Sequence, residues 1–353
     1  MTESANVLRA RTTLEVGGEA RELVVASTRE ELLAAASDLT VDRDDWVVLG
    51  GGSNVVISDD GVDGTVLVVS TRGIIRVADA DAGSEDAGET VLLRVEAGEP
   101  WDDLVAHTVG LGLAGLEALS GIPGSTGASP IQNIGAYGAE LADTLESVEF
   151  VDAETGELAR IPADELGFGY RTSIFKEGRR GVIVSVDFRL DVAVDGLSRP
   201  IAYPQLASAL GVDLGARVPI GDVRSAVLAL RASKGMVLDA GDRDTYSAGS
   251  FFTNPIVSES AARSMPDDAP RWPADEGRVK LSAAWLIERA GIRRGFALPG
   301  SRAGVSTKHT LAITNRGGAT ASDITELARF IAERVRNEFG VELRPEPNYI
   351  GFD

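Results

Sequence analysis

Hydrophobic residues near the N-terminal end of the chain form short runs of the kind found in β-strands. The β-branched runs Trp46–Leu49, Val55–Ile57 and Thr65–Val69 predict three strands. Gly50–Gly52 separate the first two runs, so these glycines lie between strands. A dinucleotide-binding fingerprint or a P-loop requires glycines between a strand and a helix. The fingerprint is therefore absent, and so is the Gly-Lys-Ser/Thr sequence that closes a P-loop.

Helix signals recur along the rest of the chain. A capping box of Thr28 and Glu31 predicts a helix over Arg29–Ser37, and Pro100 at a first helical position predicts another that ends at about Val109. A third helix is predicted over Ser282–Ala290, before Gly291. The last is a long amphipathic helix that ends at Gly340, and the residues on its apolar face are Ile324, Leu327, Ala328, Ile331 and Val335. The other predicted strands are Thr310–Thr314 and the pair Ile74–Val77 and Val91–Ala97, which flanks the acidic hairpin tip Asp79–Thr90.

The densest run of glycines lies between Gly110 and Gly138 and reads GLGLAGLEALSGIPGSTGASPIQNIGAYG. Glycine has no Cβ and adopts positive φ, so backbone amides in such a segment can approach a ligand closely. A run of ordinary turns is the simpler alternative. Turn-rich loops of this length are uncommon without a role, which favours a binding function.

The amino-acid composition excludes several classes of partner, catalytic group and metal site. The 353 residues include 34 Lys and Arg against 54 Asp and Glu, a net charge of −20, which disfavours nucleic acid and anionic membranes as partners. The absence of cysteine excludes thiolate catalysis, disulfides and cysteine metal sites, and two histidines, His107 and His309, exclude a three-histidine site. No metal site is predicted. The N-terminus lacks the apolar core of a signal peptide, and no apolar run is long enough to span a membrane, so we expect a cytoplasmic protein.

Seven segments together resemble the UDP-N-acetylenolpyruvoylglucosamine reductase (MurB) family of peptidoglycan synthesis. Each is short, but they occur in one order over nearly the whole chain. They are Gly50–Val55 (GGGSNV), Ser120–Gly138 (SGIPGSTGASPIQNIGAYG), Phe168–Lys176 (FGYRTSIFK), Arg231–Lys234 (RASK), Ala248–Pro255 (AGSFFTNP), Ser306–His309 (STKH) and Arg344–Gly351 (RPEPNYIG).

The resemblance implies an α+β fold: a two-subdomain FAD-binding module of the vanillyl-alcohol-oxidase (PCMH) type, with a C-terminal α+β substrate-binding domain. The first subdomain would span residues 1–73 and be closed by 342–353. The second would span 74–238, and the substrate-binding domain 239–341. The strand–glycine–strand order of Gly50–Gly52 agrees with this arrangement.

The resemblance also implies an NADPH-dependent, FAD-containing oxidoreductase, a UDP-N-acetylmuramate dehydrogenase. Its reaction reduces the enolpyruvyl ether of UDP-N-acetylglucosamine-enolpyruvate to UDP-N-acetylmuramate. Negative charge builds up beside the substrate carboxylate, so the site needs a cation or acid there and a proton donor to carbon.

Three residues match the family's catalytic positions. Arg171 matches the arginine that polarises the carboxylate, and Glu346 matches its acidic partner, for which we expect burial and a raised pKa. Ser250 matches the proton donor. From the residues alone, each has a simpler interpretation: a surface ion pair for Arg171, a solvated acid for Glu346 and a loop hydroxyl for Ser250.

By the same resemblance, two glycine-rich loops, Gly50–Asn54 and Ser120–Gly127, hold the FAD pyrophosphate and its ribityl chain through main-chain amides, and the segment Asn133–Ala136 lies nearer the flavin. The cofactor-binding residues are Gly50, Gly51, Gly52, Ser53, Asn54, Ser120, Gly121, Ile122, Pro123, Gly124, Ser125, Gly127, Asn133, Gly135 and Ala136. His107 lies outside the family motifs, so FAD is expected to bind non-covalently.

The substrate-binding residues implied by the resemblance are Tyr203, Arg231, Lys234 and Asn254. Tyr203 matches the mobile tyrosine loop of the family's first subtype, although a packed loop aromatic is an equal alternative. Two departures remove positive charge near the site, because many members have lysine at Thr253 and arginine at Asn348.

Two other functions remain open. One is a flavin oxidase acting on an alcohol or sugar lactone with the same FAD scaffold, and the other is a nucleotide-binding or regulatory module without activity. The expected ligands are the UDP-sugar and NADPH, and the resemblance implies a monomer.

Overall fold

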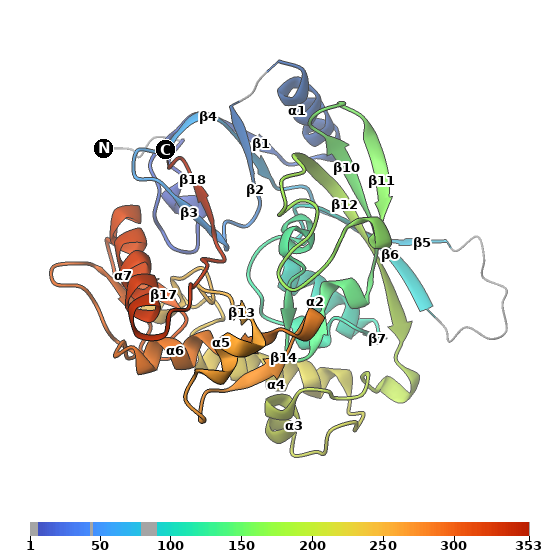
Figure 1. The fold of residues 1–353 in the computed structure, drawn as a ribbon. Coiled ribbons are helices and arrows are strands. Elements are labelled where there is room, and N and C mark those ends of the chain that lie inside the picture. The colour runs from blue at the N-terminus through green and yellow to red at the C-terminus, as the bar shows by residue number, and fades with distance from the viewer. Residues whose placement is uncertain (1–5, 43–44, 79–89, 353) are drawn as a thin grey trace. The chain divides into compact units, whose positions relative to one another are not determined.

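The computed structural model describes residues 6–42, 45–78 and 90–352 (Figure 1). The chain divides into two compact units. Unit 1 is formed by Met1–Arg21, Gly52–Asp63 and Ser233–Asp353, and unit 2 by Glu22–Gly51 and Gly64–Ala232. Both units mix helices and strands, as the sequence predicts.

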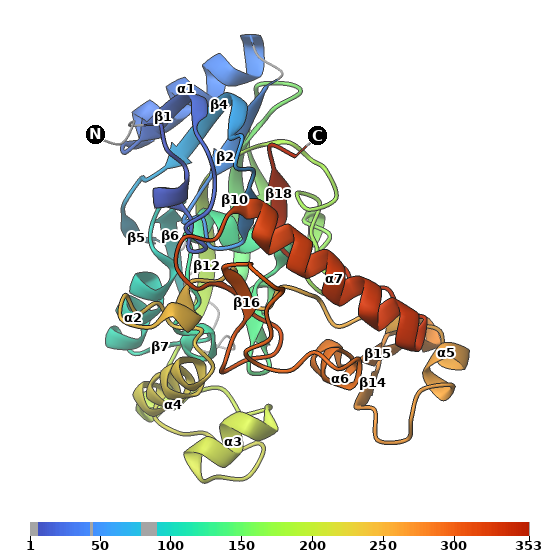
Figure 2. The same ribbon diagram turned by 90° about the vertical axis from the view of Figure 1, so that its left-hand side faces the viewer.

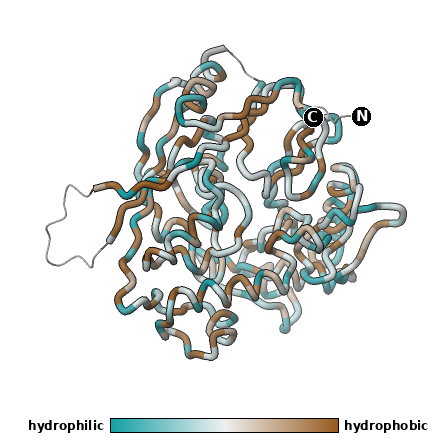
Figure 3. The backbone as a smooth tube through the Cα atoms, turned by 180° about the vertical axis from the view of Figure 1, so that it is seen from behind, coloured by the Kyte–Doolittle hydropathy of each residue, from teal (hydrophilic) through white to brown (hydrophobic). Residues whose placement is uncertain are grey.

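Unit 2 is built on a six-stranded antiparallel sheet. Its strand order is β11-β10-β12-β6-β5, and β7 also pairs with β12. Figure 3 shows hydrophobic colour along β5 and β6, the two strands next to the grey segment. The strands are β5 (Ile74–Val77), β6 (Thr90–Glu96), β7 (Leu113–Ala114), β10 (Leu145–Asp152), β11 (Leu158–Pro162) and β12 (Gly181–Val192).

The two faces of this sheet differ in chemistry. On β6, Val91, Leu93 and Val95 are buried in the core of unit 2, while Arg94 and Glu96 point to the opposite face. On the core side Trp101 of α2 (Trp101–Gly110) packs edge-on against Phe188 of β12, with ring centroids 6.0 Å apart.

A smaller sheet, most of it in unit 2, has the order β1-β4-β2, in which β2 and β4 are parallel. Helix α1 packs against β10 and β12 (Figure 1). Two further helices, α3 and α4, share a small apolar cluster. These elements are β1 (Ala20–Ala26), β2 (Trp46–Leu49), β4 (Val62–Val69), α1 (Arg29–Asp42), α3 (Pro204–Leu210) and α4 (Ile220–Ser233).

The core of unit 1 is centred on α7 (Ala321–Phe339), which lies against the hairpin of β16 (Ala303–Val305) and β17 (Ile313–Asn315) (Figure 2). Strand β18 (Asn348–Ile350) pairs in parallel with β3 (Val55–Ile57). The remaining elements are β8 (Gly135–Ala136) and β9 (Ala139–Glu140) in unit 2, and β13 (Ile256–Val257), β14 (Arg271–Pro273), β15 (Val279–Leu281), α5 (Glu259–Arg263) and α6 (Ala283–Arg289) in unit 1.

Most predicted elements are confirmed, with shifted ends. The amphipathic helix is α7, whose five predicted core residues are all buried and whose C-cap Gly340 has φ 67°. The capping box of Thr28 and Glu31 is present, and α1 continues to Asp42. Pro100 is the N-cap of α2 rather than its first residue.

One strand prediction was wrong in position, because the strand begins at Ile313 and residues 310–312 form a turn. Strands β5 and β6 pair as a hairpin, as predicted. The predicted tip lies outside the described residues, apart from Thr90. No helix in the described ranges has both the length and the hydrophobicity that a membrane span needs.

Charged side chains cover the second face of the unit 2 sheet and connect it to α1. Glu149 of β10 accepts hydrogen bonds from Arg29 of α1 at 2.6 Å and from Ser185 of β12 at 2.8 Å. Burial raises the pKa of Glu149, but these two bonds and the positive charges lower it more, to below its ordinary value of 4.5. The ionised carboxylate therefore stabilises the fold.

We predict that Glu149→Gln lowers the free energy of unfolding by about 2 kcal/mol at pH 7, because a hydrogen-bonded, mostly buried charge is lost. Since the folded-state pKa is depressed, this contribution is present above pH 4.5 and is lost as the pH falls through the folded-state value. Urea unfolding at pH 7 and at acid pH measures the difference between variant and parent, which should shrink in acid.

Glu146→Gln on the same strand is the control, because Glu146 forms an exposed pair with Arg189. It should cost less than about 0.5 kcal/mol. Equal losses for the two variants would contradict this account of the Arg29–Glu149 contact.

Candidate functional site

Two glycine segments of unit 2 lie in direct contact. A Cβ on Gly51 would lie 2.6 Å from Cα of Gly124, and a Cβ on Gly127 would lie 2.5 Å from Cβ of Ala97. A Cβ on Gly50 would likewise meet the hydroxyl of Ser125. Only glycine fits at these positions, so the sequence brings the two predicted cofactor loops together by omitting side chains.

Some main-chain amides of the second glycine loop, Ser120–Gly127, already donate hydrogen bonds to acceptors within the protein. The N–H of Gly121 donates to Oδ1 of Asp102 at 2.6 Å, and that of Gly127 donates to the carbonyl of Ala97 at 2.7 Å. Ser120 is buried, and its hydroxyl donates to the carbonyl of Glu117. Within the described ranges, three amides of this loop donate to no protein acceptor, those of Ile122, Gly124 and Ser125. They are available to an anionic ligand.

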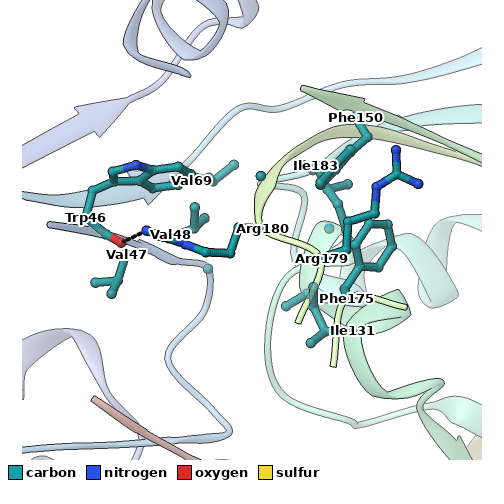
Figure 4. A pocket seen from close by; sticks show the side chains of 15 residues that line it. Trp46, Val47, Val48, Val69, Ile131, Phe150, Phe175, Arg179, Arg180 and Ile183 are labelled. Carbon is teal, nitrogen blue, oxygen red and sulfur yellow. Dashed lines mark hydrogen bonds between the residues drawn. The ribbon is translucent and has the colours of Figure 1, made fainter. Parts of the chain in front are cut away.

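A pocket of about 290 Å³ adjoins both glycine segments within unit 2 (Figure 4). Gly50 and Gly127 form part of its wall. The other lining residues are Trp46, Val47, Val48, Val69, Ala97, Ala128, Ile131, Phe150, Phe175, Arg179, Arg180, Gly181 and Ile183. Apolar and aromatic side chains with a few polar groups are typical of a site for a flat organic ligand.

Two arginines lie in the pocket wall, and Arg179 is paired with Asp152 at 3.0 Å. The guanidinium of Arg180 lies 5.3 Å from the ring centroid of Trp46 and donates to the Trp46 carbonyl at 3.4 Å, as Figure 4 shows. That of Arg179 lies 5.4 Å from the ring of Phe150. The sequence pattern indicated neither residue, because an Arg-Arg pair is not a motif in itself and recurs at Arg293 and Arg294.

Arg171 lies beside the segment Asn133–Ala136, which is predicted to bind the cofactor. Its Nη1 donates to the carbonyl of Asn133 at 3.2 Å and its Nη2 to that of Gly135 at 2.5 Å. Arg171 also has φ 57°, a left-handed conformation that is costly for a residue with a side chain. The structure therefore brings Arg171 together with the segment Asn133–Ala136.

The side chain of Asn133 is buried and holds this segment in place. It donates to Glu140 at 2.9 Å and to the carbonyl of Gly169 at 3.2 Å, and it accepts from the amide of Ala142. The Asn133 side chain thus fixes the segment, while its main-chain amide donates to the carbonyl of Pro130 and its carbonyl accepts from Arg171.

Unit 1 brings together Ser250 and Glu346. The amide of Glu346 donates to the carbonyl of Phe251 at 2.9 Å, and Phe252 forms a β-bridge with Pro345. Ser250 is half-buried, and its hydroxyl makes no hydrogen bond to the residues that the structure describes. Glu346 is half-buried too, so the burial that we expected is only partial; its raised pKa stays a prediction.

The segment Gly52–Asn54 adjoins Glu346 in the same unit. The side chain of Asn54 donates to the Glu346 carbonyl at 3.4 Å, and its own carbonyl accepts from the amide of Asn348 at 3.0 Å. Gly52, with φ 60°, accepts from the amide of Thr13, and Ser53 follows it. Residues 52–54, which belong to the first predicted cofactor loop, therefore lie beside Glu346.

The predicted substrate-binding residues are divided between the units. In unit 2 the exposed Tyr203 packs edge-on against Tyr137, with centroids 5.8 Å apart. Arg231 is 9% exposed, and burial lowers its pKa against the opposing effects of Tyr137 and Asp102.

In unit 1, Lys234 and Asn254 are half-buried, and Asn254 accepts from the amide of Ala283 at the start of α6. Thr253, which precedes Asn254, donates its amide to the carbonyl of Arg344. His107 is exposed on α2.

Two family models match the chain. An FAD binding domain covers residues 20–162, and the C-terminal domain of UDP-N-acetylenolpyruvoylglucosamine reductase covers 242–350. The first match includes both glycine segments of unit 2 and much of the pocket wall. The contact between Gly51 and Gly124 therefore lies in the region that resembles FAD-binding proteins.

We predict that Gly51→Ala removes bound flavin, because the added methyl forces Gly51 and Gly124 apart. The purified variant should retain less than about a tenth of the parent's flavin per chain, measured by visible absorbance. Gly221→Ala is the matched control, since a Cβ there on α4 meets nothing within 4 Å. Full flavin content in Gly51→Ala would show that the contact is not required.

Curated relatives match along almost the entire chain. The chain is 54% identical to the UDP-N-acetylenolpyruvoylglucosamine reductase of Leifsonia xyli subsp. xyli, over 98% of both chains, and 50% identical to that of Salinispora arenicola, over 95% and 92%. The crystal structure of the Thermus caldophilus enzyme aligns with a TM-score of 0.62 and 28% identity, over 98% of this chain and 97% of that one. The chain belongs to the MurB family of UDP-N-acetylenolpyruvoylglucosamine reductases.

Proposed function

We propose that the chain reduces the enolpyruvyl ether of UDP-N-acetylglucosamine-enolpyruvate to UDP-N-acetylmuramate, with Arg171, Ser250 and Glu346 as its catalytic residues. It is an FAD-dependent oxidoreductase of peptidoglycan precursor synthesis that uses NADPH, as its family membership establishes. The observation that carries the assignment is identity near 50% over the full length, together with the apolar pocket beside two glycine loops.

FAD fits the residues present in unit 2. We propose that its adenine occupies the pocket between Trp46, Phe150 and Ile183, and that its pyrophosphate accepts from the unused amides of Ile122, Gly124 and Ser125. Bound FAD supplies hydride transfer from NADPH to the substrate. Binding through amides requires no lysine, which suits a chain with a net charge of −20.

Arg171 and Glu346 would act on the substrate carboxylate. Arg171 carries a permanent charge, and its contacts with the carbonyls of Asn133 and Gly135 fix the direction of its guanidinium. A cation held this way stabilises the negative charge that develops as hydride reaches the double bond. Glu346 contributes a second hydrogen bond to the carboxylate when it is protonated.

Ser250 would donate the proton to the carbon that bears the carboxylate. Its hydroxyl has no acceptor or donor among the described residues, so it is available to the substrate. The main-chain bond from Glu346 to Phe251 fixes the two catalytic segments against one another. A serine is a weak acid, but the enediolate-like carbon that it protonates is strongly basic.

The remaining substrate contacts involve Tyr203, Arg231, Lys234 and Asn254. Tyr203 is exposed on the turn before α3, where it can contact a diphosphate without leaving Tyr137. Arg231 and Lys234 supply positive charge for the phosphates.

Several properties complete the proposal. FAD is bound non-covalently, because His107 faces solvent on α2. The chain acts as a monomer in the cytoplasm, and its domains are 1–73 with 342–353, 74–238 and 239–341. The parallel pairing of β18 with β3 supports the closure of the first domain by the C-terminal strand.

The competing function on the same scaffold is a flavin oxidase. Anaerobic NADPH oxidation, followed at 340 nm with and without the enolpyruvyl sugar nucleotide, distinguishes the two. The reductase oxidises NADPH in amounts equal to the added sugar nucleotide. Oxidation that requires oxygen and ignores the sugar nucleotide would overturn the proposal.

We predict that Ser250→Ala leaves the reduction of flavin by NADPH within about threefold of the parent but slows product formation at least about 100-fold. Hydride transfer to flavin needs no proton donor to substrate carbon, whereas the second half-reaction does. Stopped-flow absorbance of the flavin measures the first step and chromatography of the sugar nucleotide the second.

Ser264→Ala is the control, because Ser264 is an exposed serine in the same unit. It should change neither half-reaction. Loss of both half-reactions in Ser250→Ala would instead assign Ser250 a structural role.

A further inference from the structure

Asp102 connects the second glycine loop to a helix far away in the sequence. It lies in the first turn of α2, where Oδ1 accepts from the amide of Gly121 at 2.6 Å. The same carboxylate forms a bidentate pair with Arg224 of α4, at 2.6 and 2.9 Å. One side chain thus joins α2, the loop and α4, all within unit 2.

Several features make this contact strong. The side chain of Arg224 is 17% exposed and that of Asp102 38%. Burial raises the pKa of Asp102, but the bonds from Arg224 and Gly121 lower it more, so the carboxylate is ionised at neutral pH. Charge-assisted bidentate pairs are among the strongest side-chain hydrogen bonds in proteins.

The bond from Gly121 to Asp102 matters because Gly121 directly precedes the amides that are proposed to bind the cofactor. Gly121 has φ 71°, and the unused amides begin at the next residue, Ile122. Fixing the Gly121 peptide therefore fixes the direction of the amides that follow it. Asp102 also opposes the effect of burial on Arg231, one of the proposed substrate-binding residues on α4.

We propose that Asp102 is a positioning residue for cofactor binding: by accepting from Gly121 while paired with Arg224, it holds the loop Gly121–Ser125 with its amides directed at the FAD pyrophosphate. The inference rests on the proposed binding of FAD to this loop. The bond to Gly121 orients the loop, whereas the pair with Arg224 joins α2 to α4.

Flavin release from the purified holoenzyme tests this proposal. Release is followed by the fluorescence of free FAD after dilution, and the unfolding midpoint is measured by circular dichroism. Asp102→Ala should release flavin at least about tenfold faster than the parent, because a charge-assisted bond is lost. It should also change the visible circular dichroism of the flavin that remains bound.

Two variants separate positioning from general stability. Asp103→Ala, at the exposed neighbouring position on α2, makes the same change in charge and should release flavin at the parental rate. Arg224→Gln removes the ion pair but keeps the acceptor for Gly121, so it should lower the unfolding midpoint while flavin release stays within about threefold of the parent.

Flavin release from Asp102→Ala at the rate of Asp103→Ala would overturn the proposal. So would equally fast release from Arg224→Gln and Asp102→Ala, because Asp102 would then only connect two helices. A parental protein that lacks flavin altogether would instead contradict the proposed function, so the two failures are distinguishable.

Discussion

The candidate site depends on the contact between two segments of backbone that carry no side chains. Gly51 and Gly124 approach so closely that a single methyl group would separate them, and Gly127 lies equally close to Ala97. Gly50 and Gly127, one from each segment, form part of the wall of the aromatic pocket, and the amides of Ile122, Gly124 and Ser125 donate to no acceptor among the described residues. Main-chain amides attract an anion without a formal charge, so the site can bind a pyrophosphate in a strongly acidic chain.

Around this contact, polar side chains serve mainly to fix the main chain. Asn133 uses its amide group on Glu140, Gly169 and Ala142, and Asp102 holds Gly121. Arg171, in a left-handed conformation, is directed by two carbonyls. Each of these contacts reduces the freedom of a ligand-binding segment before the ligand arrives, which lowers the entropic cost of binding.

The sequence predicted what depends on local pattern. The helical spacing of Ile324 and Val335 located α7, and the β-branched runs located β2 and β3. The motifs that resemble the family located both glycine loops. The strand predicted from Thr310 was misplaced, because its first residues turn before pairing begins at Ile313.

Contacts between residues far apart in the chain were beyond prediction from pattern alone. Arg180 lies over Trp46 across 134 positions, and Asp102 binds Arg224 across 122. Neither pair belongs to a motif, and charged residues are common throughout this sequence. The approach of Ser250 to Glu346 also depends on tertiary pairing, since it arises from the bridge between Phe252 and Pro345.

Amide hydrogen exchange in the flavin-free and FAD-bound protein tests the central claim most directly. If the glycine loop binds the pyrophosphate, the amides of Ile122, Gly124 and Ser125 should exchange at least about tenfold more slowly with FAD bound. The amides of Gly121 and Gly127 should change less, because protein acceptors already hold them. Unchanged exchange at the first three amides, with protection elsewhere in the chain, would contradict the account.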